Sequence, residues 1–363
     1  MFKTNVSLPC LRTIWDGGLC MNIKKILFLL LVTIVSLGIM TNSFADNKMT
    51  IIAPSRTEEL DNSTNSVVIY SGAEEYRNAY FLDRLTEQFP NYDISIEYMP
   101  TGNLAAKLAA EGTDTDIDII YDLDCGYAGL VEEYLADLSA YDQSIYMPDC
   151  KVDSSKYLIE YRNGGAVIIN TEVLSEKNIP EPTCYEDLLK PEYSGLVSMP
   201  NPKSSGTGYM FLKSLVNAWG EEKAFKYFDD LTQNILQFTS SGSGPVNALV
   251  GKEVAVGFGM TPQAVLQINQ GAPLKILFFS EGSPFCLYGY AMPEGKQNKK
   301  AVRDVFDFFY TTLVQEDDEN FVPEKIFADV DFHMENYPLN IPYADMSGNT
   351  TEEKIRLLDN WEY

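Results

Sequence analysis

Residues 238–259 read FTSSGSGPVNALVGKEVAVGFG, and this stretch passes from small polar residues into a helix and then into a strand. Ser, Thr and Gly are favoured where helices begin, because hydroxyls satisfy free N–H groups and glycine permits tight turns. The segment EVAVGFG at 253–259 is short, apolar and rich in valine, which is typical of a buried strand. The stretch therefore predicts an α/β unit with a Ser- and Gly-rich loop at the helix start.

Similar loops occur at three other places in the chain. PKSSGTGY at 202–209 and YSGAEE at 70–75 each precede a helical pattern, and FFSEGSP at 278–284 follows an apolar run. In open α/β sheets, ligands bind beyond the carboxyl ends of strands, where helix N-termini attract anions. Any one of these loops is explained by helix capping alone. The four together predict a shared anion site.

Alternating strands and helices extend along most of the chain. Strands are predicted at 66–70, 93–99, 117–124, 164–170, 195–200, 253–259 and 274–279. Helices are predicted at 103–112, 210–219, 222–231 and 301–313. The early βαβαβ order indicates a parallel-rich sheet with right-handed crossovers. The acidic tail from about 315 lacks a clear period and is expected to form short helices and loops.

The N-terminal region carries an export signal. Lys24 and Lys25 precede the apolar run 26–40, and Ser43-Phe44-Ala45 forms a small-x-small cleavage site. The apolar run is shorter than the ~20 residues that span a bilayer, although a retained anchor is the alternative. We expect residues 1–45 to be an upstream segment and signal peptide cleaved after Ala45, and 46–65 to be a flexible linker. The mature protein is expected on the periplasmic or extracellular cell-surface side.

Charge and cysteine content narrow the possible partners. A net charge of −25 opposes binding to nucleic acid and to anionic membrane surfaces. One small anion can still bind locally, because backbone amides act within a few ångströms. Four irregularly spaced cysteines follow the predicted cleavage site, so one or two disulfides are permitted but no connectivity follows.

The usual catalytic arrangements are missing from the sequence. His333 is the only histidine, no G-x-S-x-G elbow occurs, and no Cys/His cluster suggests zinc. Gly251-Lys252 departs from the phosphate-loop pattern, because Glu253 replaces the hydroxyl residue. We therefore expect a protein without catalytic residues, cofactor or bound metal that is not an enzyme. An exported α/β enzyme is the alternative from a different functional class.

The motifs together resemble a known family. VVIYSGAEE, TGNLAAKLAAEG, TDIDIIYDLD, GGAVIINTEVL, NPKSSGTGY and SSGSGPVNALVGKEVAVGFG are similar to segments of ABC importer extracellular solute-binding proteins, in the ferric-iron, phosphonate and hexose-phosphate group. The resemblance covers about 66–313. It implies a two-lobed α/β clamshell of the periplasmic-binding-protein type II, with strands that cross at a hinge. It also implies a monomer that delivers its solute to a membrane permease.

The departures from the family's iron binders suggest the ligand. Those proteins typically use an adjacent Tyr-Tyr pair, which this chain lacks, although its 22 tyrosines keep ferric iron as an alternative. The Ser/Thr/Gly loops instead match phosphate-cradling loops, which implies a phosphorylated sugar or phosphonate. Asp122 and Glu281 would contact its organic part, and Tyr70 or Tyr209 would supply an aromatic wall. The implied ligand-binding set is Ser71, Gly72, Asp122, Ser204, Ser205, Gly206, Thr207, Ser241, Gly242, Ser243 and Glu281.

The order of elements also suggests how the lobes divide. We expect lobe one to comprise 66–165 and 282–363, and lobe two 166–281, each with its own sheet. The strands at 164–170 and 274–279 are expected to cross between them. Closure of such a hinge on a ligand is typical of clamshell binders.

Overall fold

A mixed sheet of nine strands forms the framework of the described chain, which comprises residues 48–56, 58–152 and 154–363 of the computed structural model. The strand order is β2-β1-β3-β9-β4-β7-β5-β6, and β8 pairs with β4. The strands are β1 Ser66–Ser71, β2 Asp93–Tyr98, β3 Ile119–Asp124, β4 Leu158–Asn170, β5 Val197–Pro200, β6 Ile235–Thr239, β7 Val256–Met260, β8 Leu274–Leu277 and β9 Phe285–Ala291. The helices are α2 Glu75–Gln88, α3 Thr101–Glu111, α4 Ala128–Val131, α5 Thr171–Lys177, α6 Gly206–Trp219, α7 Glu221–Leu231, α8 Gly244–Val250, α9 Thr261–Asn269, α10 Lys300–Phe308, α11 Val314–Asn320 and α12 Thr351–Asp359.

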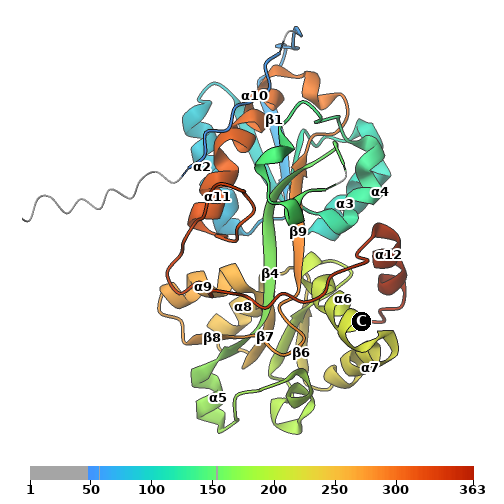
Figure 1. Ribbon diagram of the computed structural model, residues 1–363, viewed down its shortest axis with the longest axis vertical. Helices are drawn as coiled ribbons and strands as arrows, with labels where there is room; N and C mark the ends of the chain where they lie inside the picture. Colours follow the sequence, from blue (N-terminus) through green and yellow to red (C-terminus); the bar gives the residue numbers. More distant parts are fainter. Residues whose placement is uncertain (1–47, 57, 153) are drawn as a thin grey trace, which may run out of the picture. The chain divides into compact units, whose positions relative to one another are not determined.

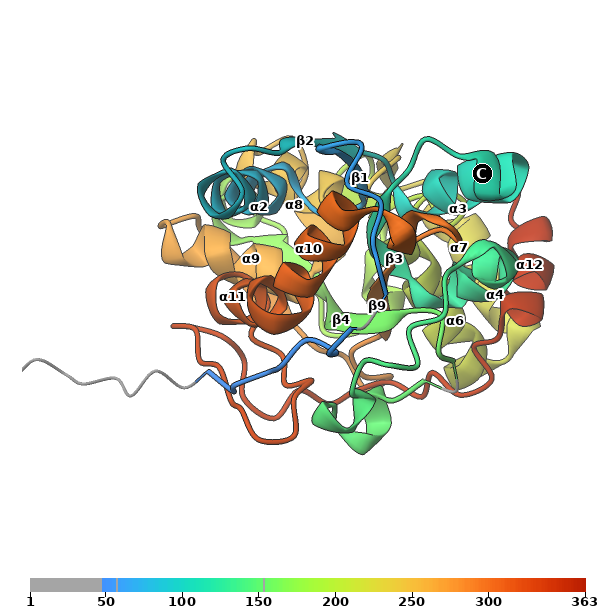
Figure 2. The same ribbon diagram turned by 90° about the horizontal axis from the view of Figure 1, so that it is seen from above.

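The first lobe is built on β1, which pairs in parallel with β2 on one side and β3 on the other. Apolar side chains alternate along β1, so Val67 and Ile69 are fully buried. The helices α2 and α10 lie on one face of this part of the sheet, and α3 lies on the other (Figure 2). The βαβαβ order and parallel pairing predicted from the sequence are confirmed.

The second lobe repeats this construction around β5, which pairs in parallel with β6 and β7. The helices α6 and α7 cover it with large apolar side chains, and Phe211, Phe228 and Phe258 are buried in one cluster. Burial of such rings is the main favourable contribution to folding. The predicted helix at 210–219 is four residues longer at its start, because Ser205 rather than Tyr209 begins it.

Strand β4 joins the two lobes (Figure 1). Its residues 158–164 pair with β9, whereas 165–169 pair with β7 and 167–170 also pair with β8. The sheet is consequently continuous through β4, where we expected two separate sheets. β4 and β9 run side by side between the lobes, which gives the expected type II clamshell with hinge-crossing strands.

One of the two predicted crossing strands was wrong. The strand within 274–279 is β8, and it pairs only with the second-lobe end of β4. Strand β9, which the sequence analysis did not identify, runs beside β4 in its place. The run FCLYGYA at 285–291 is short and apolar, which is typical of a buried strand, but the sequence analysis left it unassigned.

The segment before β1 is held against the first lobe. Met49 exchanges two hydrogen bonds with the side chain of Gln315, and Arg56 forms an ion pair with Asp307. Met49 and Arg56 thus tie part of the 46–65 segment to the first lobe, and the linker assignment itself stays a prediction. None of the four cysteines in the described residues forms a disulfide. The exact residue boundaries of the lobes stay a prediction.

Candidate ligand-binding site

A small cavity lies between the two lobes, on the line where the carboxyl ends of their parallel strands meet. It encloses ≈ 30 Å³, room for about two water molecules. It continues into a wider groove of ≈ 920 Å³, with which it shares Glu74, Tyr98, Ser241 and Ser243. The lining residues are Gly72, Glu74, Tyr98, Pro100, Thr101, Asp122, Tyr161, Ser204, Ser205, Gly206, Thr207, Ser241, Gly242, Ser243, Met260 and Tyr288.

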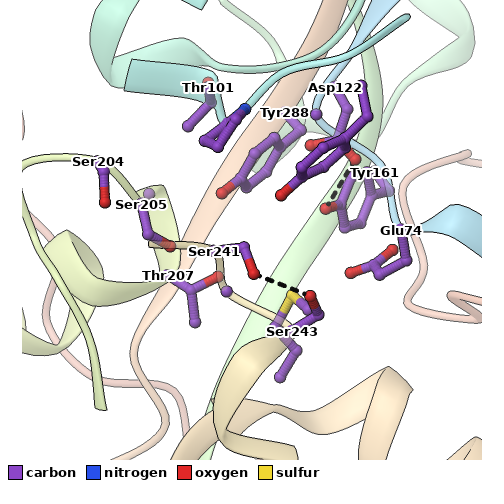
Figure 3. Close-up of a pocket in the computed structure, with 16 residues that line it drawn as sticks. Glu74, Thr101, Asp122, Tyr161, Ser204, Ser205, Thr207, Ser241, Ser243 and Tyr288 are labelled. Atoms are coloured by element: carbon purple, nitrogen blue, oxygen red, sulfur yellow. Dashed lines mark hydrogen bonds between the residues drawn. The ribbon is translucent and has the colours of Figure 1, made fainter. Parts of the chain in front are cut away.

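Hydroxyl groups from two loops form the second-lobe wall (Figure 3). The Ser205 hydroxyl accepts a long 3.4 Å hydrogen bond from the N–H of Gly208, as a helix cap does. The Ser243 side chain makes no such cap bond to α8, and its hydroxyl lies 3.1 Å from that of Ser241. A Cβ on Gly242 would overlap Thr207 Oγ1, so only glycine allows the two loops to touch.

Three helices of eight or more residues begin at the cavity. Glu74 is the N-cap of α2, Thr101 is the first residue of α3, and Ser205 is the N-cap of α6. Each helix directs the positive end of its dipole toward the same cavity. The N–H groups of Gly206 and Thr207 have no hydrogen-bond acceptor among the described residues. The cavity is therefore suited to negative charge on the α6 side.

The first-lobe wall carries carboxylates and phenols. Figure 3 shows Glu74, Asp122, Tyr161 and Tyr288 across from the serine loops. The rings of Tyr161 and Tyr288 stack with centroids 5.0 Å apart. Burial raises the pKa of both phenols well above the usual value, which keeps them protonated as hydrogen-bond donors.

Asp122 is held in an unusual conformation at the end of β3. Its backbone has φ 61°, in the left-handed region that few residues other than glycine and asparagine adopt. Its Oδ2 accepts hydrogen bonds from Arg77 (2.9 Å) and from the Tyr161 hydroxyl (3.3 Å). Its N–H donates to Glu160. Burial raises the pKa of Asp122 to about 7, so the carboxyl takes up a proton near neutrality.

Arg77 organises the carboxylates behind this wall. The guanidinium is fully buried and forms ion pairs with four carboxylates, those of Glu74, Asp122, Glu160 and Asp317. One positive charge cannot offset four negative ones in a buried site. Burial accordingly raises the pKa of Glu160 and of Asp317, so the cluster retains protons.

Comparison with known proteins identifies the family. The model of the bacterial extracellular solute-binding proteins matches residues 129–333. The chain belongs to this family. It is 27% identical over 247 residues to an uncharacterised Haemophilus influenzae protein, covering 65% of this chain and 70% of that one. It is 23% identical over 264 residues to the Escherichia coli spermidine/putrescine-binding periplasmic protein, covering 71% and 69%.

A solved structure shares the fold of this solute-binding protein. The periplasmic binding protein AfuA from Actinobacillus pleuropneumoniae, with exogenous fructose-6-phosphate bound, superposes with a TM-score of 0.73. It is 24% identical and covers 82% of this chain and 98% of its own. Proteins of this family are the solute receptors of ABC importers, which deliver small solutes to membrane permeases. Members of the family act outside the cell membrane, so this receptor is located outside the cytoplasm.

No helix of the described chain is both long and apolar enough to cross a membrane. The predicted signal peptide and the cleavage after Ala45 lie outside the described residues.

Nine of the eleven predicted site residues line the cavity of the solute-binding protein. Two do not. Ser71 points back to its own turn, where its hydroxyl accepts from the N–H of Ala73. Glu281 accepts a hydrogen bond from Trp219 Nε1, 3.0 Å away, and lines neither the cavity nor the groove. The residues that line the cavity as predicted are Gly72, Asp122, Ser204, Ser205, Gly206, Thr207, Ser241, Gly242 and Ser243.

The sequence analysis missed most of the first-lobe wall. Glu74 lay inside the loop YSGAEE, and a carboxylate at a helix start was an available signal. Tyr161 and Tyr288 lie on parts of β4 and β9 that had not been predicted as strands. The tyrosines proposed instead do not line the cavity. The Tyr70 hydroxyl lies near Asp116, and Tyr209 is a buried residue of α6.

Proposed function

We propose that this receptor captures a small solute carrying a phosphoryl or phosphonyl group, such as a phosphorylated sugar or a phosphonate. The anionic group would lie against the Ser205–Thr207 and Ser241–Ser243 loops. The organic part would face Glu74 and Asp122, which accept hydrogen bonds from hydroxyl or ammonium groups. The observation that carries the proposal is the convergence of three helix N-termini on one hydroxyl-lined cavity.

The hydrogen-bond donors around the cavity are uncharged, which supports placing the anionic group against the serine loops. None of the described lining residues is Lys or Arg, so an anion would be held by N–H and O–H groups. Such donors bind an oxyanion through short, directional hydrogen bonds and add no net positive charge to the site. The phosphate-ester ligand named for AfuA is of the same class. The ≈ 30 Å³ cavity is smaller than an organic phosphate, so binding requires some opening of the hinge.

Ferric iron is the second candidate, and the oxygen-rich first-lobe wall favours it. Glu74, Asp122, Tyr98, Tyr161 and Tyr288 offer carboxylate and phenol oxygens, which hard cations prefer. Burial raises the pKa of Tyr161 and Tyr288, so iron binding at these phenols would have to release their protons. The described residues contain no cluster of three His, Cys, Asp or Glu suited to a metal ion.

A thermal-shift screen followed by calorimetry tests the proposal. The probes are fructose 6-phosphate, 2-aminoethylphosphonate, inorganic phosphate, ferric citrate and spermidine. We expect stoichiometric binding of at least one organic phosphate or phosphonate, which is recovered chemically unchanged. Binding of ferric citrate or spermidine alone would overturn the ligand class. Turnover of a bound probe would instead support the enzyme alternative.

The serine loops give a sharper test. We expect Ser205→Ala and Ser243→Ala each to weaken binding of the probe selected by the screen about 10- to 100-fold. A hydrogen bond to a charged group contributes about 1.5–3 kcal/mol, at ~1.4 kcal/mol per decade of affinity. Calorimetry measures the affinity, and thermal unfolding measures the stability.

The matched control is Asp142→Ala. Asp142 caps the turn Gln143–Ile145 by accepting from the N–H of Ser144, and it lines neither the cavity nor the groove. Loss of this cap should cost about 1 kcal/mol of stability and leave affinity unchanged. If the Ser205 and Ser243 variants both keep wild-type affinity, the two hydroxyls are not ligand contacts.

A further inference from the structure

The C-terminal helix α12 lies within 282–363, which we expected in the first lobe, but it packs into the core of the second. Leu357 and Trp361 belong to the same buried cluster as Phe228, and the rings of Trp361 and Phe228 have centroids 5.3 Å apart. At the surface, Arg356 forms an ion pair with Glu221 of α7. Lys213 of α6 is nearly buried and pairs with Glu353 of α12. These contacts fix the helix against α6 and α7.

The same helix also reaches the first lobe. Lys354 forms an ion pair with Asp124 at the end of β3, and both side chains are 1% exposed. The Thr351 hydroxyl donates to the carbonyl of Gly126. Figure 1 shows α12 at the level between α4 of the first lobe and α6 of the second, and Figure 2 shows it beside α4. One helix therefore contacts both sides of the hinge.

Aromatic rings from both lobes enclose the Lys354 ammonium. Its Nζ lies 3.5 Å from the ring centroid of Tyr127 and 4.4 Å from that of Tyr209. Tyr127 follows β3 in the first lobe, whereas Tyr209 is on α6 in the second. A cation–π contact is stronger when the ammonium is removed from water. The ammonium thus makes favourable contacts with both lobes only while they are together.

The ion pair lies directly behind the ligand cavity. The N–H of Asp124 donates to Thr101 Oγ1, and Thr101 lines the first-lobe wall. On the other side, a Cβ on Gly206 would lie 2.7 Å from Asp124 Oδ2 and would overlap the Tyr288 hydroxyl. Because Gly206 has no side chain, the start of α6 closes against Asp124. The two walls of the cavity therefore meet at this carboxylate.

We propose that α12 is a clamp across the hinge, and that Lys354 is the positioning residue through which it favours the closed arrangement of the lobes. Removing one partner of a buried ion pair leaves the other charged, unpaired and away from water. Parting of the lobes hydrates Asp124 and relieves this unfavourable state. The loss of Lys354 therefore shifts the hinge toward opening, with or without a solute present.

Hydrogen exchange of the solute-free protein tests the clamp independently of ligand identity. In Lys354→Met, we expect amides of 126–131 and 208–209, on the two sides of the ion pair, to exchange at least ten-fold faster. A ten-fold change corresponds to ~1.4 kcal/mol. Small-angle scattering of the same samples should show a larger radius of gyration. Asp124→Asn should produce the same direction of change.

Two further variants make the outcome decisive. Lys213→Met removes another nearly buried lysine that contacts α12, but Lys213 links the helix to the second lobe only, so these segments should keep wild-type exchange. The double variant Lys354→Met/Asp124→Asn contains no unpaired charge and should fold if the single variants do not. It should still show faster exchange at the hinge than wild type. Uniform acceleration throughout the second lobe, or identical behaviour of Lys354→Met and Lys213→Met, would overturn the proposal.

Discussion

Replacing Arg77 with methionine is expected to lower the free energy of unfolding by about 3–5 kcal/mol. This is the range found when one partner of a buried ion pair is removed. Arg77 is fully buried and forms ion pairs with four carboxylates, so its loss leaves Asp122, Glu160 and Asp317 without a cation. Urea unfolding followed by circular dichroism measures the change. The decrease in the free energy of unfolding should be smaller at pH 5, because protonation of the carboxyls removes the unpaired charges.

Arg84→Met is the matched control for this experiment. Arg84 lies two turns further along α2 and also forms ion pairs, with Glu316 and Glu87, but its side chain is 29% exposed. Partly exposed ion pairs contribute about 0–1 kcal/mol. If both substitutions had the same small effect, the buried cluster would not depend on its single cation.

Asp122→Asn is expected to change how stability depends on pH. Burial raises the pKa of Asp122 to about 7, above the ~3.9 of an unfolded aspartate. The native state therefore binds more protons than the unfolded state between these values, and this carboxyl lowers the free energy of unfolding as pH rises from about 4 to 7. Asparagine carries no titrating group and tolerates the φ of 61° at this position.

As the pH rises from 4 to 8, the free energy of unfolding of the variant should increase by about 2–4 kcal/mol relative to that of wild type. Urea midpoints at each pH give this difference. Asp116→Asn is the control, because Lys107 lowers the pKa of the exposed Asp116, which gives a small slope of opposite sign. If the difference in free energy of unfolding between wild type and Asp122→Asn did not change over this range, the cluster would not hold the assigned proton.

The sequence predicted the regular part of the fold well, because amphipathic helices alternate with apolar strands there. It failed where a buried strand is polar. The first half of β4 contains Glu160, Arg162 and Asn163, all buried, so it does not match the pattern of a central strand. Glu160 is tolerated because Arg77 pairs with it. A tertiary ion pair of this kind cannot be recognised from local periodicity.

The site was predicted where local chemistry defines it. The serine loops could be located because a strand end, small residues and a helix start follow one another in sequence. Glu281 was misplaced because the strand before it ends at Leu277, and a longer turn carries the carboxylate to Trp219. Tyr288 and Lys354 come from the last quarter of the chain. Only the crossing of β9 and the docking of α12 bring them to the hinge.

The position of α12 in the chain also affects biosynthesis. Phe228 and Phe258 leave the ribosome long before Leu357 and Trp361, which complete the same core. Until translation passes Trp361, the nascent second lobe lacks two side chains that are buried in its core. Domains whose last element arrives late remain incompletely folded during synthesis and are accessible to holding chaperones. For a receptor that acts outside the cytoplasm, such a delay would favour translocation of the chain before folding is complete.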